Sequence, residues 1–365
     1  MNEKNPYQWK VFVRCFTFNH SNYIADAMNG FTMQQTTFPY VCCIVDDSST
    51  DGEKEVIKQY LQDNFDLENK SVVRNEETDD YILTFAQHKV NHNCYFAVLF
   101  LKYNHSSIRK PKGAYYKEWN KSARYISLCE GDDYWIDKQK LQKQTDYMDS
   151  HPECTMTCNR TKLFSLREGE YIGEQYCRKG DGVLNPIDVI NRTGLYISTC
   201  SIVYRPLIIE NYPDYCLKCK VGDYPLQIMA AMKGIVFYFD DVLSVYRIDN
   251  PVSWMGRQKW GTVSPERIMV ILSQIKMFKG FSEDYPQYRK IFQGKIADHI
   301  NRNIPNWHTP YKNVKEYLSY FQEEIGKYTL RWRIDMEIKK LRIPLIRRIY
   351  NIIFLRGFRL YKKMY

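Results

Sequence analysis

The feature that most constrains the fold is a pair of continuous apolar runs separated by a helical pattern. Residues 11–16 and 41–45 are apolar along nearly their whole length, which is typical of strands buried on both faces of a parallel sheet. Ser21 can cap a helix between them, whose apolar face would be formed by Ile24, Ala27, Met28 and Phe31. Such sheets bind their ligands beyond the carboxyl ends of the strands.

The remaining pattern predicts an α/β protein with a mixed, mostly parallel sheet flanked by helices and a helical C-terminal extension. The strands that we expect are residues 11–16, 41–45, 71–73, 125–129, 201–204 and 235–239. Further helices are expected after Asp51-Gly52, after Asp137, over 226–232 and from Pro265, and residues 76–121 are interpreted as an inserted or helical segment. The predicted domains are residues 1–255, a helical extension over 256–330 and a basic amphipathic tail over 331–365.

Acidic residues follow two of the predicted strands. Asp46 and Asp47 come after the strand at 41–45, whereas Glu130, Asp132 and Asp133 follow the strand at 125–129, with Gly131 at the turn. Carboxylates crowded at a strand end repel one another unless a cation lies between them. Mg²⁺ and Mn²⁺ are the natural candidates, because they prefer oxygen ligands and combine a few carboxylates with substrate phosphates. The alternatives are a solvent-exposed acidic turn and, for residues 46–51, a helix cap.

The positive charge of the chain is concentrated in its tail. Residues 331–365 hold eleven Lys and Arg against Asp335 and Glu337, so that nine of the ten net positive charges lie there and the first 330 residues carry only +1. A nucleic-acid-binding body would be basic over its own surface, so nucleic acid is not an expected partner. Basic and apolar residues alternate in the tail, which indicates an amphipathic helix on an anionic membrane surface or a helix packed on the protein body.

Cysteine usage and the N-terminus favour a cytoplasmic protein. The eleven Cys are odd in number and scattered, and residues 1–6 contain no apolar signal core. The pairs Cys154/Cys158 and Cys216/Cys219 lack a zinc-knuckle pattern, and His88 and His92 lack a third ligand, so metal binding there is the weaker interpretation. No run of 18 apolar residues occurs, so a simple membrane-spanning helix is not expected. The basic tail instead indicates peripheral association with the inner face of the cell membrane.

Three motifs, in their order along the chain, resemble family 2 glycosyltransferases. They are Thr17-Phe18-Asn19, residues 45–51 and the run Glu130-Gly131-Asp132-Asp133-Tyr134-Trp135, which is followed by residues 140–144. The resemblance covers about residues 9–255. It implies a GT-A (Rossmann-like) fold and an inverting, metal-dependent hexosyl transfer from a nucleotide-diphospho-sugar, a UDP-sugar above all.

The resemblance also implies a role for each matching residue. Asp132 would be the direct ligand of Mn²⁺ or Mg²⁺, with Glu130 and Asp133 assisting it. The catalytic base would be Asp223, in the sequence Gly222-Asp223-Tyr224-Pro225, although a plain helix N-cap is the alternative there. The residues expected to contact the nucleotide and its phosphates are Thr17, Asn19, Asp46, Asp47 and Arg247.

The sequence departs from the family pattern in four places. Phe16 stands where the family often has Pro, Glu130 replaces an Asp, and residues 248–250 replace a frequent His. The separation of Asp47 from Asp132 is longer than the family expects, which is consistent with an insertion at 76–121.

The expected function is therefore transfer of a sugar to a glycan or lipid-linked glycan in cell-surface polysaccharide synthesis. Two other functions remain open. A metal-dependent nucleotidyltransferase would usually have a Gly-rich, basic phosphate loop after the first strand, and residues 16–22 contain none. A membrane-associated scaffold without activity would not need the carboxylates of Asp132 and Asp223.

Overall fold

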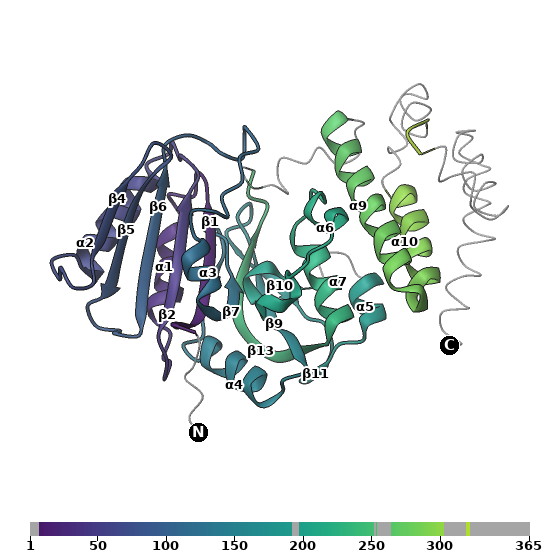
Figure 1. The fold of residues 1–365 in the computed structure, drawn as a ribbon, viewed down its shortest axis with the longest axis horizontal. Coiled ribbons are helices and arrows are strands. Elements are labelled where there is room, and N and C mark those ends of the chain that lie inside the picture. The colour runs from purple at the N-terminus through teal and green to yellow at the C-terminus, as the bar shows by residue number, and fades with distance from the viewer. Residues whose placement is uncertain (1–6, 192–196, 252, 254–263, 303–318, 322–365) are drawn as a thin grey trace. The chain divides into compact units, whose positions relative to one another are not determined.

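A computed structural model describes residues 7–191, 197–251, 253, 264–302 and 319–321 (Figure 1). The chain forms two compact units. The first comprises Met1–Pro213 and Gly222–Arg257, and the second comprises Asp214–Val221 and Gln258–Tyr365. Residues 331–365, the predicted basic tail, lie outside the described residues.

One mixed sheet organises the first unit. Its strand order is β11-β13-β9-β12-β7-β1-β2-β6-β5-β3, with β10 on β9, β4 on β5 and β8 on β13. The central strands β7, β1, β2 and β6 run parallel to one another, whereas β12 pairs with β7 and β5 pairs with β6 in antiparallel fashion. The strands are β1 (Trp9–Thr17), β2 (Tyr40–Asp46), β3 (Phe65–Asp66), β4 (Arg74–Glu77), β5 (Tyr81–His88), β6 (Cys94–Leu101), β7 (Ala123–Leu128), β8 (Tyr134–Trp135), β9 (Cys154–Ser165), β10 (Glu170–Gln175), β11 (Gly182–Val183), β12 (Val203–Tyr204) and β13 (Ile235–Ile248).

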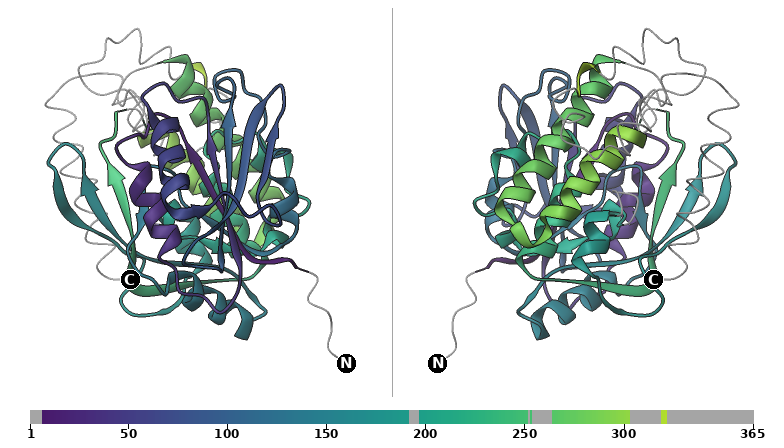
Figure 2. Two further views of the ribbon diagram at one scale, coloured as in Figure 1. Left: turned by 90° about the vertical axis from the view of Figure 1, so that its left-hand side faces the viewer. Right: turned by 90° about the vertical axis from the view of Figure 1, so that its right-hand side faces the viewer.

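Alternate residues of β1 pack into two different layers. Val11, Val13 and Cys15 belong to a fully buried cluster that includes the apolar faces of α1 and α4. On the other face, Phe12 stacks on Tyr116, which precedes α3. The helices of this unit are α1 (Ile24–Thr32), α2 (Glu53–Asn64), α3 (Lys117–Lys121), α4 (Lys140–Ser150), α5 (Pro186–Asn191) and α7 (Asp223–Lys233), with short 3-10 turns η1 (Thr199–Ser201) and η2 (Pro206–Ile208). The predicted α/β architecture is confirmed (Figures 1 and 2).

Three local predictions were wrong. Residues 71–73 form a turn, and the strand there, β4, begins at Arg74. Residues 76–121, expected to be inserted or helical, contain the end of β4, all of β5 and β6, and a short helix, α3, at their end, so the helical expectation is wrong for the first half of the segment, whereas the insertion stays a prediction. The apolar sequence of β6 was a visible signal for a buried strand. Ser21 does not cap α1, whose N-cap residue is Tyr23 with no side-chain cap bond.

The second unit is helical in its described part. It contains α6 (Asp214–Leu217), α9 (Pro265–Asp284), η3 (Pro286–Tyr288) and α10 (Arg289–Arg302). Ser264 caps α9, since its hydroxyl accepts a hydrogen bond from the Arg267 amide at 3.2 Å. None of the helices in the described ranges is long and apolar enough to cross a membrane.

Candidate active site

The three sequence motifs meet at the carboxyl ends of neighbouring strands. Thr17 and Asp46 are register partners at the ends of β1 and β2. The Asp47 amide donates to the Thr17 carbonyl at 3.0 Å, and the Gly131 amide donates to the Phe16 carbonyl at 2.9 Å. Parallel pairing of β7, β1 and β2 therefore brings together segments that are far apart in the chain.

Glu53, which lies outside the sequence motifs, joins the first two of them. This carboxylate is fully buried at the start of α2. It accepts hydrogen bonds from the Thr17 hydroxyl, the His20 amide at 2.9 Å and the Ser49 hydroxyl at 2.7 Å. Acidic residues are common in the first turn of a helix, so the sequence position of Glu53 gives no signal of a special role. Its complete burial in the structure shows that it holds the ends of β1 and β2 together.

Asn19 provides a second connection between the two loops. Its backbone adopts a positive φ of 58°, and its amide donates to the Ser49 hydroxyl at 2.9 Å. Its side-chain oxygen accepts from the Thr50 amide at 2.9 Å. Asn tolerates this left-handed conformation better than most residues, which is a structural reason for Asn at this position.

Asp46 and Asp47 are almost completely buried and are bonded within the protein. Asp46 accepts from the Ser49 amide at 3.0 Å, and burial raises the pKa of the Asp46 carboxyl to about 6. Asp47 accepts from the amides of His105 and Ser106 at 2.8 and 3.1 Å and from the Lys112 ammonium at 2.8 Å. Burial opposes ionisation of Asp47, but these bonds lower its pKa overall. Contact of either residue with a nucleotide stays a prediction.

Asp132 lies beside two further polar side chains that the motifs did not indicate. Its Oδ2 accepts from the Asn250 amide group at 3.0 Å and lies 3.7 Å from Nε2 of His20. His20 in turn lies 3.3 Å from the Thr17 hydroxyl. The Asp132 side chain keeps 13% of its surface exposed, so one carboxylate of the acidic turn is held in place and still accessible.

The two other acidic residues of the turn differ from Asp132. Burial raises the pKa of Glu130 to about 7, with Arg14 opposing the shift and Asp132 adding to it. Asp133 is buried and accepts a hydrogen bond from the Arg247 amide at 2.8 Å. Burial, followed by the charge of Asp132, raises the pKa of Asp133 well above its usual range. Asp133 therefore fastens the acidic turn to β13 in this structure.

The Arg247 guanidinium is already engaged by neighbouring groups. It donates to the Asp132 carbonyl at 2.8 Å and pairs with Asp26. The guanidinium carbon lies 4.4 Å from the ring centre of Tyr134 and 5.1 Å from that of Tyr23. Arg247 thus braces the acidic turn, and its predicted contact with a diphosphate remains untested.

Asp223 is the first residue of α7, with Gly222 in the N-cap position. Its carboxylate accepts from the Tyr224 amide at 2.8 Å and from the Thr199 hydroxyl at 3.4 Å, and burial raises its pKa. After burial itself, the charges of Asp133, Asp132 and Asp223 all contribute to a raised pKa of Tyr246. Asp223 and the acidic turn therefore lie within electrostatic reach of one phenol.

The donor atoms of the acidic turn fit a divalent cation that takes few protein ligands. Among the described residues, no group of three or more His, Cys, Asp or Glu side chains is arranged to enclose a metal ion. Mg²⁺ in particular is often held by one or two carboxylates together with substrate phosphates. An accessible Asp132 with Glu130 nearby meets that requirement, whereas Asp133 is directed toward the Arg247 amide.

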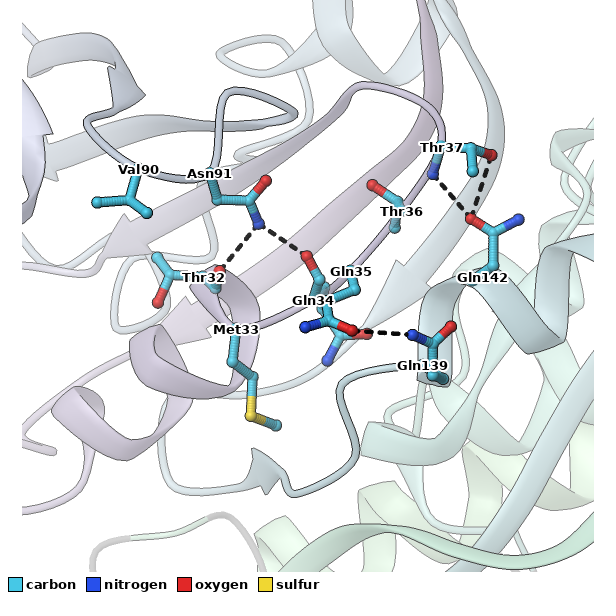
Figure 3. Close-up of a pocket in the computed structure, with 10 residues that line it drawn as sticks. All are labelled: Thr32, Met33, Gln34, Gln35, Thr36, Thr37, Val90, Asn91, Gln139 and Gln142. Atoms are coloured by element: carbon cyan, nitrogen blue, oxygen red, sulfur yellow. Dashed lines mark hydrogen bonds between the residues drawn. The ribbon is translucent and has the colours of Figure 1, made fainter.

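A polar pocket of about 600 Å³ lies at the other edge of the sheet. Figure 3 shows its amide-rich lining, in which Gln35 bonds Gln139 and Asn91 bonds the backbone of Thr32 and Gln34. Most of its residues precede the amino ends of β2 and β6, and Gln139 and Gln142 lie at the start of α4. It is therefore separate from the acidic motifs, which follow the carboxyl ends of their strands.

Comparison with known proteins agrees with this geometry. Residues 15–82 match the model of glycosyl transferase family 2. The predicted resemblance to this family is confirmed. The matched segment contains Thr17, Asn19, Asp46 and Asp47, and thus most of the predicted nucleotide-contacting residues.

Relatives and solved structures extend the comparison beyond that segment. The uncharacterized protein Rv1520 of Mycobacterium tuberculosis is 28% identical over 298 residues, which are 79% of this chain and 73% of Rv1520. The crystal structure of residues 1–349 of TarS from S. aureus in complex with UDP has a TM-score of 0.59 at 15% identity, covering 93% of this chain and 86% of TarS 1–349. The structural likeness confirms the GT-A fold.

Proposed function

We propose that this protein transfers a sugar from a nucleotide-diphospho-sugar, a UDP-sugar first of all, to a hydroxyl of a glycan with inversion of the anomeric centre. The observation that carries the proposal is the convergence of Thr17, Asp46 and Asp132 at the carboxyl edge of the sheet, the ligand-binding edge of such folds. The match to family 2 and the similarity to a TarS structure solved with UDP support it.

In this mechanism, each carboxylate has a separate task. Asp132, assisted by Glu130, would hold Mn²⁺ or Mg²⁺, which would neutralise the charge that develops on the leaving diphosphate, while Asp133 holds the acidic turn against the Arg247 amide. Asp223 accepts the proton of the attacking hydroxyl as its oxygen bonds to the anomeric carbon and the sugar–phosphate bond breaks. The raised pKa of Asp223 strengthens it as a base, and the Thr199 hydroxyl orients its carboxylate.

A thermal-shift screen of UDP-, GDP- and other nucleotide-sugars, with and without Mn²⁺, tests the donor assignment. A ligand bound only by the folded state raises the unfolding temperature, so at least one donor should stabilise the protein, and more strongly with Mn²⁺. Asp223→Asn should keep this stabilisation and lose sugar transfer. Loss of folding in Asp223→Asn would favour a structural role for Asp223 instead.

We further propose that the acceptor is a lipid-linked glycan at the inner face of the cell membrane, in cell-surface polysaccharide synthesis. The support is the composition of residues 331–365, where each basic residue near an anionic surface contributes about 1 kcal/mol. Co-sedimentation with phosphatidylglycerol vesicles should fall sharply when residues 331–365 are removed. Unchanged binding after that truncation would exclude a membrane role for the tail.

A further inference from the structure

An aromatic row crosses the sheet next to the acidic turn. It consists of Tyr23, Tyr134, Phe164 and Tyr171, arranged around Arg247. In the sheet, Arg247 of β13 is the register partner of Phe164 on β9, and Phe164 is the partner of Tyr171 on β10. The row therefore joins strands that are distant in the chain.

Direct contacts connect the members of the row. The hydroxyls of Tyr134 and Tyr171 are 3.0 Å apart, and the ring of Phe164 meets that of Tyr171 edge-on at 5.3 Å. The Arg247 guanidinium lies against the rings of both Tyr134 and Tyr23. These contacts fix the orientation of the rings before any ligand arrives, which reduces the entropy lost on binding.

The outer end of the row is open to solvent. Tyr171 is 51% exposed, and its neighbour Ile172 is 46% exposed. Tyr23, Tyr134 and Phe164 are half-buried. The Phe164–Tyr171 pair stabilises the β9–β10 hairpin, and the exposed part of the Tyr171 ring is in addition accessible to a ligand.

The inner end of the row is continuous with the proposed transfer site. Tyr134 directly follows Asp133, and Arg247 binds both the Asp132 carbonyl and, through its own amide, the Asp133 carboxylate. A molecule resting on the rings would therefore lie beside the turn that the proposed donor phosphates occupy.

We propose that the aromatic row is the binding platform for the acceptor, and that the acceptor segment bound there is a saccharide chain. This inference rests on the proposed glycosyl transfer. Sugar rings present flat patches of C–H groups that pack on aromatic faces, while their hydroxyls bond Tyr hydroxyls and cationic donors. Both kinds of group are present, because the Lys162 ammonium lies 5.2 Å from the ring centre of Tyr171 and Arg247 lies at the inner end.

Saturation-transfer NMR on the full chain, with UDP and Mn²⁺ present, tests the platform. The probes are chitotetraose, maltotetraose and mannotetraose. At least one should bind the wild type, and Tyr171→Ala should weaken it by about tenfold, the usual scale for loss of an aromatic anchor. Tyr176→Ala is the matched control, because Tyr176 is 56% exposed and lies just beyond β10, outside the row.

UDP binding is measured in the same samples to separate two kinds of failure. Retained UDP binding in Tyr171→Ala shows that the variant is folded and that only the saccharide site changed. Equal saccharide binding by wild type and Tyr171→Ala, or binding of no probe by the wild type, would overturn the platform. Failure of the wild type to bind UDP or any nucleotide-sugar would instead contradict the proposed function, whatever the saccharides do.

Discussion

At the scale of single residues, the acidic turn depends on the absence of a side chain at Gly131. A Cβ there would lie 2.1 Å from the Thr17 hydroxyl oxygen and 2.6 Å from the Thr17 Cβ. The Gly131 amide also donates a hydrogen bond to the Phe16 carbonyl. Moving the backbone of Gly131 away from Thr17 would therefore break this bond and displace Asp132. Glycine is thus required by the close approach of two motifs.

We expect Gly131→Ala to lower the transfer rate by about 100-fold, since small displacements of reacting groups have effects of that size. Steady-state kinetics with the donor found by thermal shift would measure it. Gly113→Ala is the control, because the nearest atom to a Cβ there is the Tyr116 hydroxyl at 3.8 Å. Equal activity of both variants would mean that the position of the turn is not critical.

The buried carboxyl of Asp46 predicts a pH-dependent stability. Burial raises its pKa from 3.8 to about 6. The folded state therefore binds the proton more tightly than the unfolded state. The stability that the protonated Asp46 carboxyl contributes to the folded state is fully present below pH 4 and is lost as the pH rises through 6. Asp46→Asn can still accept the Ser49 hydrogen bond, and it should gain up to about 3 kcal/mol relative to wild type between pH 4 and 7. Urea unfolding measures the free energy of unfolding of both proteins at each pH. A difference between Asp46→Asn and wild type that stays constant across this range would contradict the prediction.

Individual site residues were predictable to different degrees. Asp132 was predictable because other acidic residues and Gly131 surround it in the sequence, and Asp223 because Gly222 and Pro225 mark a turn before a helix. His20, Glu53 and Asn250 form contacts with the motifs that only the pairing of strands distant in the chain creates. Single polar residues of ordinary type carry no local signal for such contacts.

At the scale of elements, the segment between β6 and α3 is fastened to the site edge by Asp47. The amides of His105 and Ser106 and the Lys112 ammonium all bond this one carboxylate, which is 2% exposed. The sequence alone predicted an insertion here, but not that an acidic motif residue would anchor it.

Asp47→Ala should release this segment. Loss of the buried acceptor should raise the hydrogen-exchange rates of the His105 and Ser106 amides by about 10- to 100-fold, which corresponds to about 1–3 kcal/mol. Asp79→Ala, at an exposed carboxylate between β4 and β5, is the control. Unchanged exchange in Asp47→Ala would show that other contacts hold the segment.

The sheet itself was only partly predictable. Continuous apolar runs identified β1, β2 and β7 because burial on both faces leaves no polar alternation. β4 and β5 are more polar strands on one side of the sheet, and their sequences contain no comparable signal. Their assignment depends on antiparallel pairing with one another and with β6.

At the scale of the whole molecule, the chain leaves the first unit after Pro213, contributes Asp214–Val221 to the second, and returns at Gly222. In the second unit, Tyr215 lies directly over Gly280 of α9, where a Cβ would come within 2.2 Å of its ring. The Tyr215 hydroxyl donates to Asp284 at 2.6 Å. The segment just before Asp223 is therefore anchored in the helical unit.

Gly280→Ala should destabilise the second unit by about 1–3 kcal/mol through overpacking. Thermal unfolding and limited proteolysis would detect it, while UDP binding should persist because the site residues belong to the first unit. Gly294→Ala is the control, since no atom lies within 4 Å of its added Cβ. Equal destabilisation by both substitutions would refute the packing argument.

The most direct test of the central claim is the identity of the product released from a nucleotide-sugar. We predict that the wild type with Mn²⁺ and a glycan acceptor releases a nucleoside diphosphate and forms an inverted glycosidic bond. Asp132→Ala should abolish this release, and Asp79→Ala should leave it intact. Pyrophosphate as the product would indicate nucleotidyl transfer, no product from any donor would indicate a non-catalytic scaffold, and full activity of Asp132→Ala would contradict the role assigned to the acidic turn.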